Sequence, residues 1–260
     1  MNKKKKIMSK FYTVMVVGES PDELMKPYDM GLKVEPYVKY RYLDADDLKE
    51  KALKVTQGVI DNAPLLKLSK YQVDYMNEKL KALRGMSSFE YYTYLTNGLL
   101  YDKEGNALTE ENPNGKWDKY NLGANFSYPL KLVDGTEKYQ SVASEVDWSS
   151  MHYNPKSVQY FESVWELMMG HVEPKGDDDL KLMSLWENKK NYLSNFKDKD
   201  AFVSHNCAYW CYAYLDKDGW KDFDTEKDPN WVTSFFDKFV SKIGDDETIT
   251  IFEFSRRNDD

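Results

Sequence analysis

The order in which strand-like and helix-like segments follow one another constrains the fold of this 260-residue chain most strongly. Residues 11–18 are β-branched and aromatic and end in glycine, which predicts a strand closed by a turn. Residues 248–254 alternate in polarity and predict a final strand. The segments between them predict an α+β fold with a mixed or mostly antiparallel sheet, helices packed on one face and a helical insertion.

The domain organisation follows from the position of the helical patterns. Stretches 44–62 and 71–83 carry apolar residues at helical spacing, which predicts an insertion over about 44–90. We expect one α+β domain over 11–260, because the chain shows no linker rich in Pro, Gly or Ser. A run of four lysines precedes it, and no apolar stretch of signal-peptide length follows that run. We therefore expect a basic, flexible tail over 1–10.

Composition excludes several classes of protein. The chain carries 36 Lys and Arg against 44 Asp and Glu, a net charge of −8, which argues against general nucleic-acid binding. Aromatic residues make up 15% of the chain, which argues against disorder. No apolar run approaches the ~18–20 residues of a membrane helix, so we expect no membrane partner.

The two cysteines, Cys207 and Cys211, bear on the compartment. We predict a strand over 202–215, where four residues span roughly 13 Å, too far for a disulfide. This spacing favours a reducing, cytoplasmic location. On such a strand His205 and both thiols share one face, but a straight strand cannot bring them to one zinc ion. We therefore expect no metal.

Residues 112–123 form the first candidate ligand site, with the sequence Asn-Pro-Asn-Gly-Lys-Trp-Asp-Lys-Tyr-Asn-Leu-Gly. On a strand, Lys116, Asp118 and Tyr120 would share one face, with Trp117 on the other. The lysine could bind a phosphate, and the tyrosine could stack on a base. Alternatively, Trp117 is a core residue, and Lys116 and Asp118 stabilise the preceding turn.

Tyr40 and Arg41 belong to a second cluster of aromatic and basic residues. Arginine is scarce in this chain, which has four. Arg41 could clamp a base and a phosphate by stacking and charge. It could equally be a surface residue of an edge strand.

Three stretches together resemble a broad set of small phage-encoded proteins of unassigned activity. They are the strand 11–18 with the helix after it, the Asn-Pro-x-x-Lys-Trp-Asp-x-Tyr-x-x-Gly motif at 112–123, and a C-terminal part. That part has a hairpin ending in Gly219-Trp220, a helix over 231–242, and Asp-Asp-Glu-Thr at 245–248 before a last strand over 249–254. The resemblance spans nearly the whole chain in order. It implies a phage accessory protein that acts in the host bacterial cytoplasm, a class that commonly opposes bacterial defence.

This chain departs from the family pattern at two places. The family continues after the motif with Gly, Arg and Trp, where this chain has Ala124, Asn125 and Phe126. The family's last strand often ends in an Asp/His polar pair, where this chain has Glu253 and Phe254 followed by a serine. These departures argue against catalysis, and we name no catalytic residue and expect no cofactor.

We expect a non-enzymatic inhibitor of anti-phage immunity that sequesters a small nucleotide signal in an aromatic pocket lined by lysine and arginine, as a monomer or a homo-oligomer. One alternative is a protein that binds a host defence or CRISPR enzyme directly. Another is a nucleotide-degrading enzyme that uses Asp118 or Glu145 with His152. The candidate ligand-binding residues are Lys116, Trp117, Asp118, Tyr120, Asn125, Arg41 and Tyr40.

Overall fold

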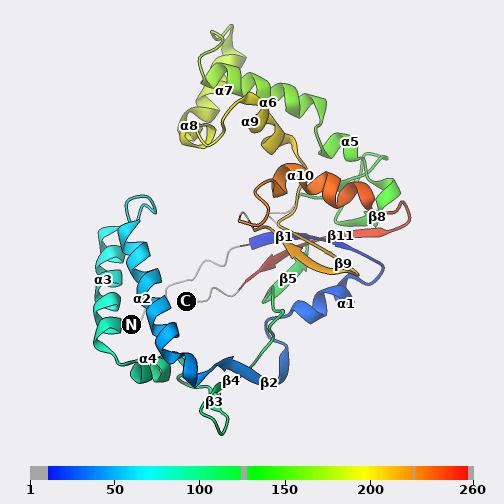
Figure 1. Ribbon diagram of the computed structural model, residues 1–260. Coiled ribbons are helices and arrows are strands. Elements are labelled where there is room, and N and C mark those ends of the chain that lie inside the picture. Colours follow the sequence, from blue (N-terminus) through cyan, green and yellow to red (C-terminus); the bar gives the residue numbers. More distant parts are fainter. Residues whose placement is uncertain (1–10, 124–127, 225, 257–260) are drawn as a thin grey trace, which may run out of the picture. The chain divides into compact units, whose positions relative to one another are not determined.

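The computed structural model describes three segments of the chain, residues 11–123, 128–224 and 226–256. Two compact units make up the chain: Met1–Met30 with Asn114–Asp260, and Gly31–Pro113 (Figure 1). Both units combine helices with strands, so the predicted α+β class is confirmed. The second unit extends further in both directions than the helical insertion expected over about 44–90.

A six-stranded mixed sheet forms the centre of the first unit. Its strands are β1 (Phe11–Val17), β5 (Lys119–Leu122), β8 (Gln140–Val142), β9 (Ala213–Asp216), β10 (Gly219–Asp222) and β11 (Thr248–Ser255). They follow the order β10-β9-β1-β11-β5, and β8 also pairs with β11. Strand β1 is antiparallel to β11 and parallel to β9. The two terminal strands predicted from the sequence are therefore direct neighbours.

Helices lie on both faces of this sheet. The helices of the first unit are α1 (Pro21–Met25), α5 (Trp148–Met151), α6 (Pro155–Met168), α7 (Asp177–Trp186), α8 (Lys190–Leu193), α9 (Lys199–Cys207) and α10 (Trp231–Lys238). Met15 of β1 packs in a cluster with Phe235 of α10, whereas Val16 packs with Met25 of α1. Because successive side chains of β1 are buried on opposite faces, helices cover both faces rather than the one expected (Figure 1).

Residues 202–207, which we predicted as part of a strand, belong instead to helix α9. The Asp198 carboxylate caps this helix by accepting a hydrogen bond from the Ala201 amide at 2.8 Å. Phe202 is fully buried and contacts Trp165 in the core that α9 shares with α6 and α7. Tertiary packing outweighs the strand propensity of this aromatic segment.

The second unit contains three helices and a small antiparallel sheet in the order β2-β4-β3. Its elements are β2 (Lys33–Tyr40), α2 (Ala45–Asp61), α3 (Lys70–Gly85), α4 (Ser88–Leu95), β3 (Leu100–Tyr101) and β4 (Ala107–Glu111). Helices α3 and α4 each begin with a capping box, formed by Ser69 with Gln72 and by Ser87 with Glu90. The helices predicted over 44–62 and 71–83 are therefore present, with a third helix after them.

The chain leaves the first unit after Met30 and returns to it at Asn114. The two crossing points are joined by backbone hydrogen bonds within the first unit. The Lys116 amide donates to the Tyr28 carbonyl at 2.7 Å, and the Met30 amide donates to the Trp117 carbonyl at 2.8 Å. The remaining short elements are η1 (Lys26–Tyr28), η2 (Tyr42–Asp44), β6 (Leu130–Lys131), β7 (Glu137–Lys138), η3 (Ala143–Glu145), η4 (Glu187–Lys189) and η5 (Val240–Lys242).

Candidate functional site

A cavity of about 890 Å³ lies in the first unit, where the start of β1 meets the residues around α5, α6 and α9. This volume is within the range of small-molecule sites. Its aromatic lining residues are Phe11, Tyr12, Tyr128, Phe161, Tyr192, Tyr209, Trp210 and Tyr212. The lysine and acidic side chains among the described lining residues are Lys131 and Glu137, and His205 also lines the cavity. Aromatic walls with little charge suit a planar group such as a nucleobase.

The cavity wall includes thiol and phenol groups that are held neutral. Burial raises the pKa of the Cys211 thiol to about 11 and the pKa of the Tyr209 phenol well above its ordinary value. Burial also raises the pKa of Cys207 and lowers the pKa of His205. At neutral pH these thiols are protonated, and a protonated thiol is a poor nucleophile. The wall therefore favours binding over thiolate chemistry.

His205 and Cys207 lie on helix α9, and Cys211 lies in the segment between α9 and β9. The expectation that all three share one strand face is wrong, because the segment is helical up to Cys207. All three nevertheless line the same cavity. Across the described residues, no group of three or more His, Cys, Asp or Glu side chains is placed to hold a metal ion.

A cluster of two cations and one carboxylate lies beside this cavity. The Arg256 Nη2 donates to the Asp222 Oδ2 at 2.8 Å, and the Lys116 Nζ lies 3.3 Å from the same oxygen. The Arg256 Nε also donates to the Lys116 carbonyl at 3.1 Å. The three side chains are about one-third exposed, so the cluster is open to solvent. Together they carry a net charge of +1.

Two rings connect the cation cluster with the cavity. Tyr12 and Tyr212 both line the cavity, and the guanidinium carbon of Arg256 lies 5.6 and 5.2 Å from their ring centroids. Arg256 also donates to the Tyr212 hydroxyl at 3.4 Å. Burial raises the pKa of Tyr212, and the charge of Arg256 opposes this shift. The fold therefore places a cation directly against the aromatic wall.

Of this cluster, the sequence pattern predicts only Lys116 as a site residue. The pattern does not single out Asp222, Tyr12 or Tyr212, and Arg256 is one of the four arginines of the chain. The signal that could identify these residues is the strand order, because all of them lie at the same end of neighbouring strands. At that end β1 begins at Phe11 and β9 at Ala213, while β10 ends at Asp222 and β11 at Ser255.

The other motif residues are mainly structural in this fold. Trp117 is buried, and its indole Nε1 donates to the Met25 carbonyl at 3.0 Å. The Tyr120 hydroxyl donates to Asp22 Oδ1 at 2.6 Å, and its ring packs edge-on against Trp117. Strand β5 begins at Lys119, so Lys116 is not part of it and the predicted shared face of Lys116, Asp118 and Tyr120 does not form.

The backbone of Asp118 is fixed, because its amide donates to the Ser255 carbonyl at 2.8 Å. Asn125 lies outside the described residues. Tyr40 and Arg41 belong to the second unit, where the Tyr40 carbonyl accepts from the Tyr92 hydroxyl at 3.0 Å and Arg41 is exposed.

One of the two departures named above can be placed in the structure. Glu253 is buried and pairs in register with Thr13, a residue that lines the cavity. Residues 124–126 lie outside the described residues.

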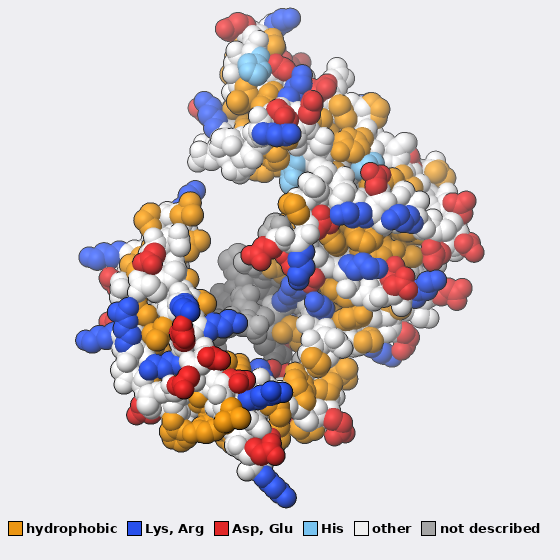
Figure 2. Space-filling view, viewed as in Figure 1, with side chains coloured by type: hydrophobic (Ala, Val, Ile, Leu, Met, Phe, Trp, Pro, Cys, Tyr) orange, Lys and Arg blue, Asp and Glu red, His pale blue; other side chains and the backbone are white. Residues whose placement is uncertain are grey.

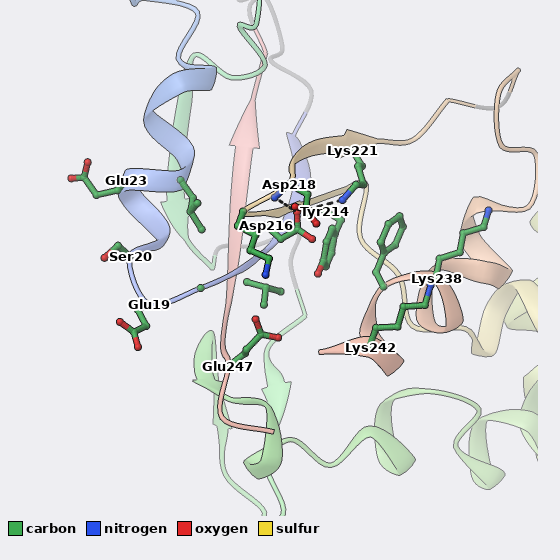
Figure 3. A pocket seen from close by; sticks show the side chains of 15 residues that line it. Glu19, Ser20, Glu23, Tyr214, Asp216, Asp218, Lys221, Lys238, Lys242 and Glu247 are labelled. Atoms are coloured by element: carbon green, nitrogen blue, oxygen red, sulfur yellow. Dashed lines mark hydrogen bonds and ion pairs between the residues drawn. The ribbon is translucent and has the colours of Figure 1, made fainter. Parts of the chain in front are cut away.

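A second depression, of about 760 Å³, lies at the opposite ends of β1 and β9 (Figure 3). Four lysines and five carboxylates line it, so its charges nearly balance. Lys221 lies 3.4 Å from Asp216, and Lys238 pairs with Asp228 at 2.5 Å. Carboxylates outnumber lysines here, whereas the Arg256–Lys116 cluster has two cations to one carboxylate, so the depression is the weaker candidate for an anionic ligand.

Comparisons with family models, with curated proteins and with solved structures give no match to this chain. Within the described segments, no helix combines the length and apolarity needed to cross a bilayer. The function must therefore be inferred from the cavity and the cation cluster.

Proposed function

We propose that this protein binds and sequesters a small nucleotide without converting it. One observation carries the proposal: Tyr12 and Tyr212 line the aromatic cavity and also contact the guanidinium of Arg256. Aromatic rings bind bases by stacking, and arginine binds phosphate through charge-assisted hydrogen bonds. A nucleotide is a ligand that uses both features at once.

The groups on the cavity wall support binding rather than turnover. Burial keeps Cys211 and Tyr209 protonated at neutral pH, as their raised pKa values indicate. His152, which we considered as a base, accepts a hydrogen bond from the Tyr209 amide at 3.1 Å and stacks on Phe236 at 4.0 Å. Burial lowers its pKa, which suits a neutral structural histidine.

The biological role we propose is that of a phage accessory protein in the host cytoplasm, which removes a nucleotide signal from a bacterial defence system. The family resemblance of residues 112–123 supports this role. Sequestration requires high affinity but no catalytic group, and the neutral thiols and phenol of the cavity wall agree with this requirement.

Native mass spectrometry tests the proposal directly. The protein is purified from bacteria with active defence systems, and released small molecules are identified after denaturation. We expect one bound nucleotide per site, chemically unchanged on prolonged incubation, and the measured mass also gives the number of subunits. A protein that is empty under these conditions and binds no added nucleotide would contradict sequestration, and a converted nucleotide would favour the enzyme hypothesis.

The exposed apolar side chains of the second unit favour a second candidate function, direct binding to a host defence protein. Tyr71, Phe89 and Tyr94 on α3 and α4 are 74%, 61% and 63% exposed. Figure 2 shows hydrophobic side chains gathered around α4, and acidic and basic side chains interspersed over the visible face. Exposed aromatic residues are common at protein interfaces. A pull-down from host lysate that loses its partner on Phe89→Ser, with folding intact, would support this function.

A further inference from the structure

The carboxylate of Asp222 occupies the point where two cations converge. Arg256 Nη2 and Lys116 Nζ approach the same oxygen, Asp222 Oδ2, at 2.8 and 3.3 Å. Because both distances end on one atom, the two nitrogens are at most about 6 Å apart. Two cationic donors at that separation can each bind a different oxygen of one phosphate group at ordinary charge-assisted distances of about 2.8 Å.

Arg256 is held more firmly than the Asp222 carboxylate. The guanidinium of Arg256 lies against the rings of Tyr12, Tyr212 and Phe254 at 5.2 to 5.6 Å, and its Nε donates to the Lys116 carbonyl. These contacts do not depend on Asp222. They keep the cation in place when the carboxylate moves away, which makes the arginine a preformed binding group.

Asp222, in contrast, is the last residue of β10, the strand at the edge of the described sheet. Its side chain is 27% exposed and pairs with the two cations, Arg256 and Lys116. A rotation of this side chain into solvent leaves the backbone pairing of β10 unchanged. The cluster then carries two positive charges, which match the two negative charges of a phosphate monoester.

We infer that the Asp222 carboxylate occupies an anion-binding site between Arg256 and Lys116 in the free protein. The phosphate group of the bound nucleotide displaces this carboxylate. This inference rests on the proposed function. Asp222 acts as an internal competitor that selects for phosphate-bearing ligands over monoanions and neutral nucleosides. The ligand class is therefore a nucleotide with an accessible phosphate, and the base occupies the aromatic cavity.

Calorimetric titrations with AMP, GMP, CMP and UMP, each paired with its nucleoside, test this inference. Asp222→Asn removes the competitor without changing size, and we expect it to tighten nucleotide binding by roughly five- to tenfold and to leave nucleoside binding unchanged. Asp216→Asn is the matched control, because Asp216 is a carboxylate of the same hairpin that pairs with Lys221. We expect this control to bind like the wild type.

A second variant keeps the test valid if Asp222→Asn does not fold. Lys116→Gln retains the Arg256–Asp222 pair, and we expect it to weaken nucleotide binding about tenfold while nucleoside binding stays the same. If nucleotides bind the wild type but Asp222→Asn and Lys116→Gln leave their affinities unchanged, the inferred anion-binding site is wrong and the proposed function stands. If neither nucleotides nor nucleosides bind the wild type, and native mass spectrometry also finds no nucleotide, the proposed function itself fails.

Discussion

The rings of Tyr12 and Tyr212 lie with their centroids 4.3 Å apart, although 200 positions separate them in the sequence. Tyr12 belongs to β1, and Tyr212 directly precedes β9, the parallel neighbour of β1. The pair forms part of the cavity wall and contacts the guanidinium of Arg256. Nucleotide affinity should therefore depend on both rings.

Replacement of Tyr212 by leucine tests the aromatic wall. We expect Tyr212→Leu to weaken nucleotide binding by about tenfold or more, because stacking on one ring contributes ~1–3 kcal/mol per base. Calorimetric titration measures the change. Tyr75→Leu is a suitable control, since Tyr75 is an exposed tyrosine of the second unit and should not alter binding. Equal affinities of both variants would argue against the aromatic cavity as the base site.

The buried position of Trp117 predicts a loss of stability rather than of contact with a ligand. Its side chain is 9% exposed and donates a hydrogen bond to the Met25 carbonyl. We expect Trp117→Ala to lower the free energy of unfolding by about 3–5 kcal/mol, measured by urea denaturation. Trp210→Ala provides the contrast, because Trp210 is 37% exposed on the cavity wall. We expect Trp210→Ala to keep its stability and lose nucleotide affinity. If Trp117→Ala is stable but does not bind nucleotides, Trp117 belongs to the binding site rather than to the core.

Gly123, the last residue of the central motif, should not tolerate a side chain. Its φ is +57°, and a Cβ atom there would lie 2.3 Å from the ring of Tyr139. We expect Gly123→Ala to lower the free energy of unfolding by about 2–5 kcal/mol, from overpacking and the left-handed backbone together. Gly135 has a φ of +84°, and a Cβ atom added there would meet no atom within 4 Å, so Gly135→Ala should show the smaller backbone effect, about 1–2 kcal/mol. Urea denaturation of both variants separates the two contributions.

Stability at alkaline pH should depend on Tyr120. Burial, followed by the carboxylate of Asp22, raises the pKa of Tyr120 to about 12. A tyrosine in the unfolded chain has a pKa of about 10, so between about pH 10 and 12 the unfolded chain loses a proton that the folded chain keeps. The folded state is therefore progressively destabilised as the pH rises through this window, and the full contribution is present below it.

Urea denaturation of the wild type and of Tyr120→Phe at pH 8, 10 and 11 isolates this contribution from those of other tyrosines. We expect the wild type to be more stable at pH 8, and the difference between the two proteins to shrink as the pH rises above about 10. A difference that stays constant from pH 8 to pH 11 would contradict the raised pKa of Tyr120.

The sequence predicted the parts of the fold that depend on local pattern. Residues 11–18 and 248–254 form strands as expected, and the helices over 44–62 and 71–83 are present. It failed at 202–207, where an Asp198 cap and the packing of α9 produce a helix from a strand-like composition. That outcome depends on contacts with α6 and α7, which local pattern does not contain.

The candidate site was harder to predict, because it is assembled from distant segments. Lys116 was selected from its motif, but Arg256 lies 140 positions away, and Asp222 lies 106 positions away. The order of the strands brings them together, and that order cannot be read from residue spacing. Trp117 was selected for its motif although its side chain belongs to the core.

The hydrogen bonds that join Tyr28 to Lys116 and Met30 to Trp117 also bear on how this protein can change during evolution. They close the loop through which the second unit, Gly31–Pro113, is inserted. These hydrogen bonds of the first unit offset the entropy lost on closing the loop. That entropy depends only weakly on the number of inserted residues. Residues 31–113 can therefore be shortened, exchanged or diversified among related proteins with little effect on the closure of the first unit, so the two units are free to evolve at different rates.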